Sequence, residues 1–169
     1  MNYRVIKKQQ NSKMCMVCGL KNPFGLKSAF YELENNELLA VFKPMEEHQS
    51  YPNLLHGGVS SAMLDETIGR AIMGTSSEMI WGVTTELGVK FRKPVPLDQE
   101  LRIRARITRN TSRLFEGSGE LLLEDGTVAV EAYGKYMKMP LSKIADFDEE
   151  EQEWKVIPNP DDPETVSLP

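Results

Sequence analysis

The sequence predicts an α+β fold in which one long helix is enclosed by a curved antiparallel sheet. Residues 55–74 are apolar around most of the circumference of the helix that they would form, as expected of a buried helix. Two strand-like segments precede this helix and four follow it, with turn residues between them. A sheet that curls around one helix would bury the apolar surfaces of both.

The chain has 169 residues, which is enough for one domain with its own hydrophobic core. We expect that domain to span residues 1–139, with residues 1–26 as a lead-in segment, and residues 140–169 to form an acidic, proline-containing tail. The tail carries a net charge of −7 and the rest of the chain +2, against −5 overall. Such a composition is typical of a solvated appendage, flexible or draped over the surface, which either keeps the protein soluble or binds a partner.

The two strands before the helix are expected at residues 27–33 and 37–43. The polar turn Glu34-Asn35-Asn36 between them has a suitable length for an antiparallel hairpin. Residues 44–53 contain prolines and polar side chains and should form the loop that leads to the helix.

The first strand after the helix is expected at residues 81–92, where two faces alternate. One face carries Val83, Thr85, Leu87, Val89 and Phe91, and the other carries Thr84, Glu86, Gly88, Lys90 and Arg92. A second alternating strand begins at Leu101, and residues 113–124 and 127–139 form a hairpin about Asp125-Gly126.

Three arginines lie on the outward face of the strand that begins at Leu101, namely Arg102, Arg104 and Arg106. They can pair with glutamates on neighbouring strands, which is ordinary surface electrostatics. Alternatively, together with Lys90, Arg92 and Lys93, they can contact the phosphates of a nucleotide-bearing ligand. Both interpretations are open at this point.

The only two cysteines, Cys15 and Cys18, form a CxxC motif in the lead-in segment. Such a pair can be redox-active, supply half of a zinc site or consist of two structural thiols. With no second cysteine pair and only His48 and His56 in the chain, the composition argues against a closed four-ligand zinc site. A thioredoxin-type role would need a preceding strand and a βαβ context, which the sequence does not indicate.

Other classes of protein are disfavoured by composition. No basic patch is interleaved with aromatic residues, so we expect no nucleic-acid partner. No apolar run approaches the roughly eighteen residues needed to span a bilayer, and the polar, basic start does not resemble a secretory signal. We therefore expect a soluble, cytoplasmic protein without a membrane partner.

The predicted helix opens with His56-Gly57-Gly58 and carries two adjacent acids, Asp65 and Glu66. Backbone N–H groups at the positive end of a helix favour a negative oxygen, and glycine lets a ligand approach the backbone closely. The alternative is that the glycines only permit a tight turn into the helix. His56 is either a substrate contact or a structural residue at the start of the helix.

Helical spacing separates the two acids. Glu66 has Arg70 four residues later, which makes it a ready partner in an ion pair. Asp65 has Ser61 and Gly69 at the corresponding positions, so it faces small residues and no cation. We therefore predict that Asp65, more than Glu66, is a general base or nucleophile, with both roles left open.

These motifs resemble the hotdog-fold thioesterases of the PaaI type. The resemblance rests on His56-Gly57-Gly58, on an acid nine residues after the histidine, and on a following strand that begins Gly82-Val83-Thr84-Thr85. Two further stretches are similar to one branch of that family, namely Cys18-Gly19 with Asn22-Pro23-Phe24-Gly25-Leu26, and His48-Gln49 with Tyr51-Pro52. The resemblance covers about residues 15–139.

The resemblance implies a curved sheet around a central helix, assembly into homodimers or homotetramers, and hydrolysis of acyl-CoA thioesters. Gly57 then matches the glycine whose N–H polarises the thioester carbonyl, Asp65 the catalytic carboxylate, and Thr84 a hydroxyl that helps to place water. A further polar residue of the family corresponds to either Gln49 or Asn53. The remaining residues expected to contact the substrate are His56, Gly58, Ser61 and Glu66. CoA is part of the substrate, and we expect no cofactor and no metal.

Gly57 and Asp65 are too far apart to act on one thioester from the same helix. Eight residues at 1.5 Å each separate them by roughly 12 Å, whereas reacting groups lie within about 3 to 3.5 Å of the substrate. We therefore predict that Gly57 of one chain faces Asp65 of another across a twofold interface. Two alternatives to a thioesterase are a non-catalytic acyl-CoA-binding or sensing domain and, less favoured, an enoyl-CoA hydratase.

Overall fold

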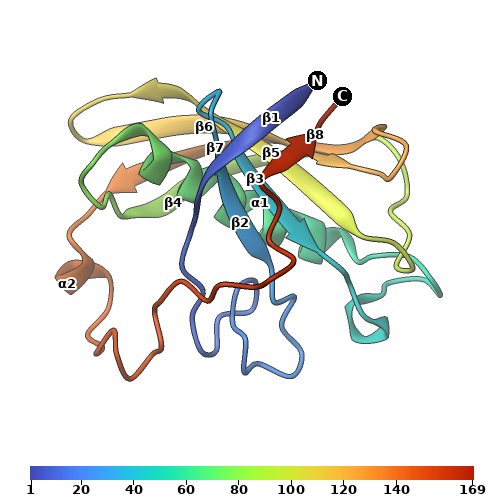
Figure 1. Ribbon diagram of the computed structural model, residues 1–169, viewed down its shortest axis with the longest axis horizontal. Coiled ribbons are helices and arrows are strands. Elements are labelled where there is room, and N and C mark those ends of the chain that lie inside the picture. Colours follow the sequence, from blue (N-terminus) through green and yellow to red (C-terminus); the bar gives the residue numbers. More distant parts are fainter.

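The computed structural model describes residues 1–169 as a single eight-stranded sheet and one long helix (Figure 1). The strands are β1 (Asn2–Lys8), β2 (Ala29–Leu33), β3 (Leu38–Phe42), β4 (Gly82–Phe91), β5 (Leu101–Asn110), β6 (Leu114–Leu122), β7 (Val128–Lys138) and β8 (Thr165–Ser167). The helices are α1 (Gly57–Ala71) and the short α2 (Leu141–Ile144), with the 3-10 turns η1 (Glu46–His48) and η2 (Ile72–Thr75). No helix is long and apolar enough to cross a membrane.

All neighbouring strands pair antiparallel, in the order β4-β7-β6-β5-β3-β2-β1-β8. The sheet curves around α1, which packs against β3 to β7 (Figure 1). The predicted α+β architecture is therefore confirmed. The two edges of the sheet are β4 and β8, so β4 has β7 as its one partner and an open edge on the other side.

Helix α1 is buried because apolar residues recur on it at helical spacing. Met63, Leu64 and Ile68, and Ile72 directly after the helix, have no exposed surface and belong to the main core cluster, together with side chains from β3, β5, β6 and β7. The continuous core fixes the position of every side chain that α1 presents, including both acids.

The predicted turns are present. Gly126 has φ of 80°, the left-handed conformation that a glycine tolerates, and Thr127 N–H donates to Asp125 Oδ1 at 2.8 Å. Asn36, at the predicted turn between β2 and β3, also has positive φ. Both hairpins thus form where the turn residues place them.

Strand β4 departs from simple alternation because it contains a β-bulge between Thr84 and Glu86. Before the bulge, Thr84 is paired with the buried Tyr136. Beyond the bulge, Leu87 and Val89 pack against the core on the same side of the strand. The expectation that Thr84 lies on the face opposite Leu87 is therefore wrong. The extra residue of the bulge turns the Thr84 side chain to the helix side of the sheet.

The chain termini are built into the sheet. β1, which the polar sequence did not predict as a strand, pairs with β2 on one side and with β8 on the other. Val166 and Leu168 are buried in a second, smaller core cluster. The acidic run at residues 146–151 is mostly exposed, but the end of the tail differs from the expected solvated appendage because it completes the sheet.

The middle of the tail is attached to the lead-in segment. Lys13 N–H donates to the Gln152 carbonyl at 2.8 Å, and Asn11 forms a backbone bridge with Lys155. Lys8 forms an ion pair with Asp162 at 2.6 Å. The lead-in and the tail therefore form one layer beside α1 (Figure 1).

Candidate active site

The start of α1 presents one free backbone donor. His56 is the N-cap of the helix, and its Nδ1 accepts a hydrogen bond from Gly58 N–H at 2.8 Å. Gly57 N–H, the first of the helix, donates to no group in the protein. A Cβ at Gly57 would lie 3.2 Å from the Phe91 ring, so the glycine also permits close packing against β4. The helix start can therefore donate one hydrogen bond to a ligand oxygen.

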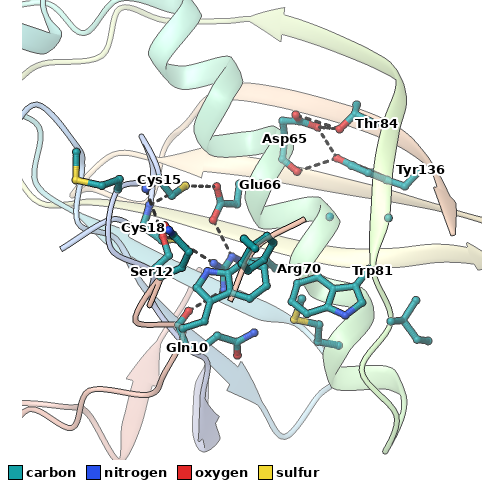
Figure 2. Close-up of a pocket in the computed structure, with 18 residues that line it drawn as sticks. Gln10, Ser12, Cys15, Cys18, Asp65, Glu66, Arg70, Trp81, Thr84 and Tyr136 are labelled. Carbon is teal, nitrogen blue, oxygen red and sulfur yellow. Dashed lines mark hydrogen bonds and ion pairs between the residues drawn. The ribbon is translucent and has the colours of Figure 1, made fainter. Parts of the chain in front are cut away.

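Asp65 is held by two hydroxyl groups and by no cation. Thr84 Oγ1 lies 2.9 Å from Asp65 Oδ1 and 3.2 Å from Oδ2. The Tyr136 hydroxyl lies 3.1 Å from Oδ1 and 2.9 Å from the Asp65 main-chain oxygen (Figure 2). Burial, reinforced by the Asp65 charge, raises the pKa of Tyr136 well above its usual range, so this tyrosine stays a neutral donor.

Glu66 points to the other side of the helix and is paired. Arg70 Nε lies 2.8 Å from Glu66 Oε1, and the Cys15 thiol lies 3.2 Å from Glu66 Oε2. The predicted ion pair is therefore confirmed. Of the two acids, Asp65 is the one without a compensating charge.

A cavity of about 490 Å³ lies beside both acids. Its lining includes Asp65, Thr84 and Tyr136 on one side and Cys15, Cys18, Glu66 and Arg70 on the other (Figure 2). Much of the remaining wall is apolar and consists of Met73, Ile80, Trp81, Phe147 and Trp154. This size and mixture of surfaces are typical of a small-molecule pocket with a few polar groups.

The tail contributes the aromatic part of that wall. Trp154 is stacked on Trp81 with ring centroids 4.6 Å apart and planes at 2°, and Phe147 packs edge-on against Trp154 at 5.0 Å. The tail thereby supplies part of the cavity wall, beside the start of β4.

The remaining predicted site residues do not line this cavity. Ser61 Oγ donates to the Gly57 carbonyl at 2.9 Å, and Gln49 and Asn53 are exposed in the loop before the helix. Within one chain, a first group of predicted residues therefore lies around the helix start, namely His56, Gly57, Gly58, Ser61, Gln49 and Asn53. Asp65, Glu66 and Thr84 form a second group at the cavity.

Sequence reasoning missed Tyr136 and Trp154. Tyr136 has a recognisable signal, because Val130, Ala132, Gly134 and Tyr136 alternate toward the core, and a buried tyrosine hydroxyl needs a partner. Trp154 has none, because it lies in an acidic stretch without periodicity.

The outward arginines are paired with glutamates. Arg104 and Arg106 both contact Glu120, at 3.1 and 2.6 Å, and Arg92 contacts Glu131 at 2.8 Å. The cross-strand pairing expected from the sequence is therefore present for these three arginines, and contact of the basic residues with a phosphate stays a prediction.

Cys15, Cys18 and Glu66 offer three donor atoms within 4.8 Å of one another, the spacing of a metal site. However, Arg70 Nη2 lies 3.1 Å from Cys18 Sγ while Arg70 Nε contacts Glu66. A cation therefore already balances these ligands, and a closed zinc site would need a fourth ligand. The cluster does not fit a structural zinc ion.

Comparison with known proteins shows which families and folds this chain is similar to. The family model described as Thioesterase superfamily matches residues 52–130. The acyl-coenzyme A thioesterase THEM4 of Bos taurus is 27% identical over 123 residues, which are 70% of this chain and 49% of that protein. An uncharacterized protein of Schizosaccharomyces pombe is 28% identical over 98 residues, 58% of this chain and 55% of that protein. The chain thus spans about half the length of these curated relatives.

Solved structures share the fold. A crystal structure of a thioesterase superfamily protein has a TM-score of 0.67 at 24% identity and covers 73% of this chain and 59% of its own. The Escherichia coli PaaI protein from the phenylacetic acid degradation operon has a TM-score of 0.61 at 12% identity, with 68% and 81% covered. The architecture shared with these structures is the hotdog fold, and residues 52–130 of this chain are similar to the thioesterase superfamily.

Proposed function

We propose that the protein hydrolyses an acyl-CoA thioester to a free acid and CoA. The observation that carries this proposal is the uncompensated carboxylate of Asp65, held by Thr84 and Tyr136 at the edge of a largely apolar cavity. The cavity suits an acyl chain, and the carboxylate suits the activation of an oxygen nucleophile. The similarity to an acyl-coenzyme A thioesterase supports the choice of substrate.

In this proposal, Asp65 acts on the thioester carbonyl carbon in one of two ways. As a general base it takes a proton from a water molecule, whose oxygen then attacks the carbonyl; as a nucleophile it attacks directly, and water cleaves the resulting anhydride. In both routes the C–S bond breaks and CoA leaves as a thiol. Tyr136 and Thr84 both hold Asp65 Oδ1, whereas Oδ2 has only the longer contact with Thr84 and is the oxygen that we assign to substrate or water.

The developing oxyanion requires a donor, and we assign this role to Gly57 N–H of a second chain. Two features support a twofold arrangement. The separation along α1 is roughly 12 Å, which is too long for one thioester. The ten-residue strand β4 has an open edge next to the helix start, where Phe91 packs against Gly57. A homodimer, itself able to form a tetramer, would then contain two equivalent sites.

The competing functions are separated by measurement. A hydratase would need a histidine near the acid, and within one chain neither His48, with Nε2 2.6 Å from the Phe24 carbonyl, nor His56, which caps α1, lines the cavity. In the proposed dimer, His56 of the second chain accompanies Gly57, so the hydratase stays a competing function. An acyl-CoA sensor would retain the cavity without turnover, so only measurement distinguishes it from an enzyme.

The deciding experiment measures thiol release from a panel of aryl, short-chain and long-chain acyl-CoAs. The proposal predicts turnover of at least one of them by the wild-type protein. Binding of acyl-CoA without release of thiol from any chain length would establish the sensor, and hydration of an enoyl-CoA without thiol release would establish the hydratase.

The assignment of Gly57 has its own test, because proline can remove the N–H without breaking the helix. Proline is well tolerated at the first helical position, and His56, with φ of −63° and ψ of 132°, already has the conformation that precedes a proline. Gly57→Pro should lower kcat by about 10²- to 10³-fold, the usual effect of losing one oxyanion donor. Gly57→Ala keeps the N–H and meets the same Phe91 ring, so it is the matched control.

Mixed dimers test the shared site. When Gly57→Pro and Asp65→Asn chains exchange at random, each mixed dimer contains one site with both groups intact, so activity should return to about a quarter of the wild-type value. If each site lay within one chain, mixing two inactive variants would restore no activity.

A further inference from the structure

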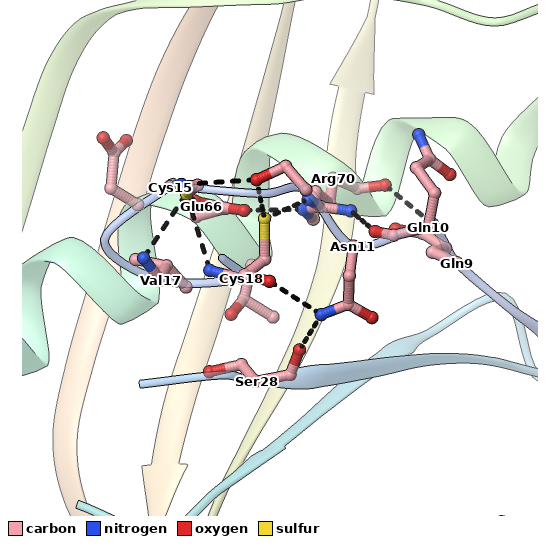
Figure 3. Close-up of polar contacts among 12 residues, drawn as sticks. Gln9, Gln10, Asn11, Cys15, Val17, Cys18, Ser28, Glu66 and Arg70 are labelled. Carbon is pink, nitrogen blue, oxygen red and sulfur yellow. Dashed lines mark hydrogen bonds and ion pairs between the residues drawn. The ribbon is translucent and has the colours of Figure 1, made fainter. Parts of the chain in front are cut away.

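The wall of the cavity opposite Asp65 contains both cysteines of the chain. Cys15, Cys18, Glu66 and Arg70 form a contiguous group, which we call the dithiol cluster (Figure 3). Cys15 Sγ and Cys18 Sγ lie within 4.8 Å of each other and of a Glu66 carboxylate oxygen. Nothing in the proposed hydrolysis uses either sulfur.

A tight turn holds the two sulfurs together. Gly19 N–H donates to the Cys15 carbonyl at 2.8 Å, which places Cys18 one turn after Cys15. A Cβ at Gly19 would overlap the Cys15 backbone, so the turn requires glycine. Asn11 Nδ2 donates at 2.9 Å to the carbonyls of both Cys18 and Ser28 and so fixes the turn to the start of β2 (Figure 3). The cluster is therefore built into the fold.

The two sulfurs have different environments. Cys15 is partly exposed to the cavity and accepts hydrogen bonds from the N–H groups of Val17 and Cys18 at 3.3 and 3.5 Å. The hydrogen bond from the Cys18 thiol, together with these backbone donors, lowers the pKa of Cys15 despite its burial and the nearby Glu66 charge. Cys18 is 1% exposed, and its hydrogen bond to Cys15 and its burial raise the pKa of the Cys18 thiol.

Arg70 is placed to act on the buried sulfur. Its Nη2 lies 3.1 Å from Cys18 Sγ, and the guanidinium is held by the Gln10 carbonyl, by Glu66 and by the face of Phe30, 4.4 Å away. A buried guanidinium next to a thiol stabilises a thiolate on that sulfur.

We propose that Cys15 and Cys18 form a redox-active dithiol that reacts with low-molecular-weight disulfides entering the cavity. Cys15 is the attacking thiol, because its sulfur is accessible from the cavity and accepts hydrogen bonds from two backbone N–H groups. Cys18 is the resolving thiol, because its sulfur is enclosed and lies within reach of Cys15. This proposal does not depend on thioester hydrolysis.

The exchange takes place in two balanced steps. The Cys15 thiolate attacks one sulfur of the incoming disulfide, whose S–S bond breaks, and one thiolate leaves. Cys15 has then lost its charge, so the main cause of the high Cys18 pKa is removed while Arg70 stays at 3.1 Å. The Cys18 proton goes to the departing thiolate, Cys18 attacks Cys15, and the second thiolate leaves and takes up the proton that Cys15 released on ionisation. Two protein thiols are oxidised to a disulfide, and the small disulfide is reduced to two thiols.

The test exposes the full-length reduced protein to oxidised glutathione and counts thiols after denaturation. Because the chain has only two cysteines, the count refers to this cluster alone. We expect both thiols to be lost, with a mass lower by two hydrogen atoms and no cross-linked dimer on a non-reducing gel. Retention of both thiols, or a disulfide between chains, would overturn the proposal.

Single variants test the order of attack. Cys18→Ser should retain one glutathione on Cys15, and Cys15→Ser should leave its remaining thiol unmodified under the same conditions. Equal modification of the two variants would mean that the sulfurs are merely two independent thiols. If either variant fails to fold, peptide mapping of wild-type protein treated with limiting iodoacetamide gives the same information. Alkylation should then fall on Cys15, and preferential alkylation of Cys18 would refute the assignment.

Discussion

The two sides of the cavity surround the neighbouring acids Asp65 and Glu66 with different partners. Asp65 faces strands β4 and β7, where it contacts only neutral hydroxyl donors, whereas Glu66 faces the lead-in segment and pairs with Arg70. Successive helical residues point about 100° apart, so one position along α1 decides which wall a side chain meets. The comparison teaches that the surroundings, more than the residue type, separate a carboxylate that is available for chemistry from one that is structural.

Exchanging the two carboxylates for amides gives the largest expected difference. Asp65→Asn should lower kcat for thioester hydrolysis by about 10²- to 10⁴-fold, the usual contribution of a general base, because the amide cannot accept the proton. Glu66→Gln, the matched control on the opposite wall, should retain most of the activity. Both rates are measured by thiol release, with folding verified by circular dichroism. Comparable activity losses in the two variants would contradict the distinction between the walls.

Removing the cation of the opposite wall should affect stability strongly. Arg70→Met leaves Glu66 and the Gln10 carbonyl without their partner in a buried setting, which typically costs about 3 to 5 kcal/mol of unfolding free energy. The measurement is urea denaturation of the variant against wild type. The double variant Arg70→Met with Glu66→Leu removes both charges and should recover part of the loss. If the double variant is less stable than Arg70→Met alone, the lost ion pair is not the cause of the loss in stability.

Removing a hydroxyl from the Asp65 wall should have a smaller effect. Tyr136→Phe keeps the stack on Phe115, 4.9 Å away, but removes one hydrogen-bond donor from Asp65. We expect the unfolding free energy to fall by about 1 to 3 kcal/mol and the rate of hydrolysis to fall as well. Thr84→Val is the companion variant on β4. If both keep full activity, the two hydroxyls do not position the carboxylate.

The pH dependence of stability provides a second measurement on Tyr136. Its pKa is raised in the folded state above the unfolded value of about 10, so the folded protein retains a proton that the unfolded chain loses. The corresponding stability is complete below about pH 10 and declines as the pH rises further. The pKa of Tyr31 is also raised, but Tyr31 is present in both the wild type and Tyr136→Phe. The quantity to compare is therefore the difference in unfolding free energy between these two proteins at each pH. A stability difference that does not change across this range would contradict the raised pKa of Tyr136, which is caused first by burial and then by Asp65.

The parts that could be predicted from the sequence are those fixed by local periodicity. The apolar circumference of residues 55–74 predicts the buried helix, Asp125-Gly126 predicts the β6–β7 turn, and the spacing of Glu66 and Arg70 predicts their ion pair. Each depends on residues close together in the chain, where geometry follows directly from the element type.

The parts that could not be predicted depend on distant residues or on irregular backbone. The bulge after Thr84 reverses the side on which that residue lies, and simple alternation contains no sign of it. Tyr136 reaches Asp65 across 71 positions of sequence. The burial of Val166 follows from the pairing of β8 with β1, two polar terminal segments that pair across nearly the whole chain.

The smallest expected effect concerns a tail residue that lines the cavity. Trp154→Ala removes the stack on Trp81, an interaction of about 0.5 to 1.5 kcal/mol, and enlarges the cavity at the tail. If the acyl chain extends to this wall, kcat/KM for long acyl chains should rise severalfold relative to short ones, because the added length no longer meets the indole. Trp154→Phe preserves an aromatic ring at this position and should keep the wild-type chain-length profile. An identical profile for the alanine variant would mean that the acyl group lies wholly on the Asp65 side, and that the tail stabilises the lead-in without touching the substrate.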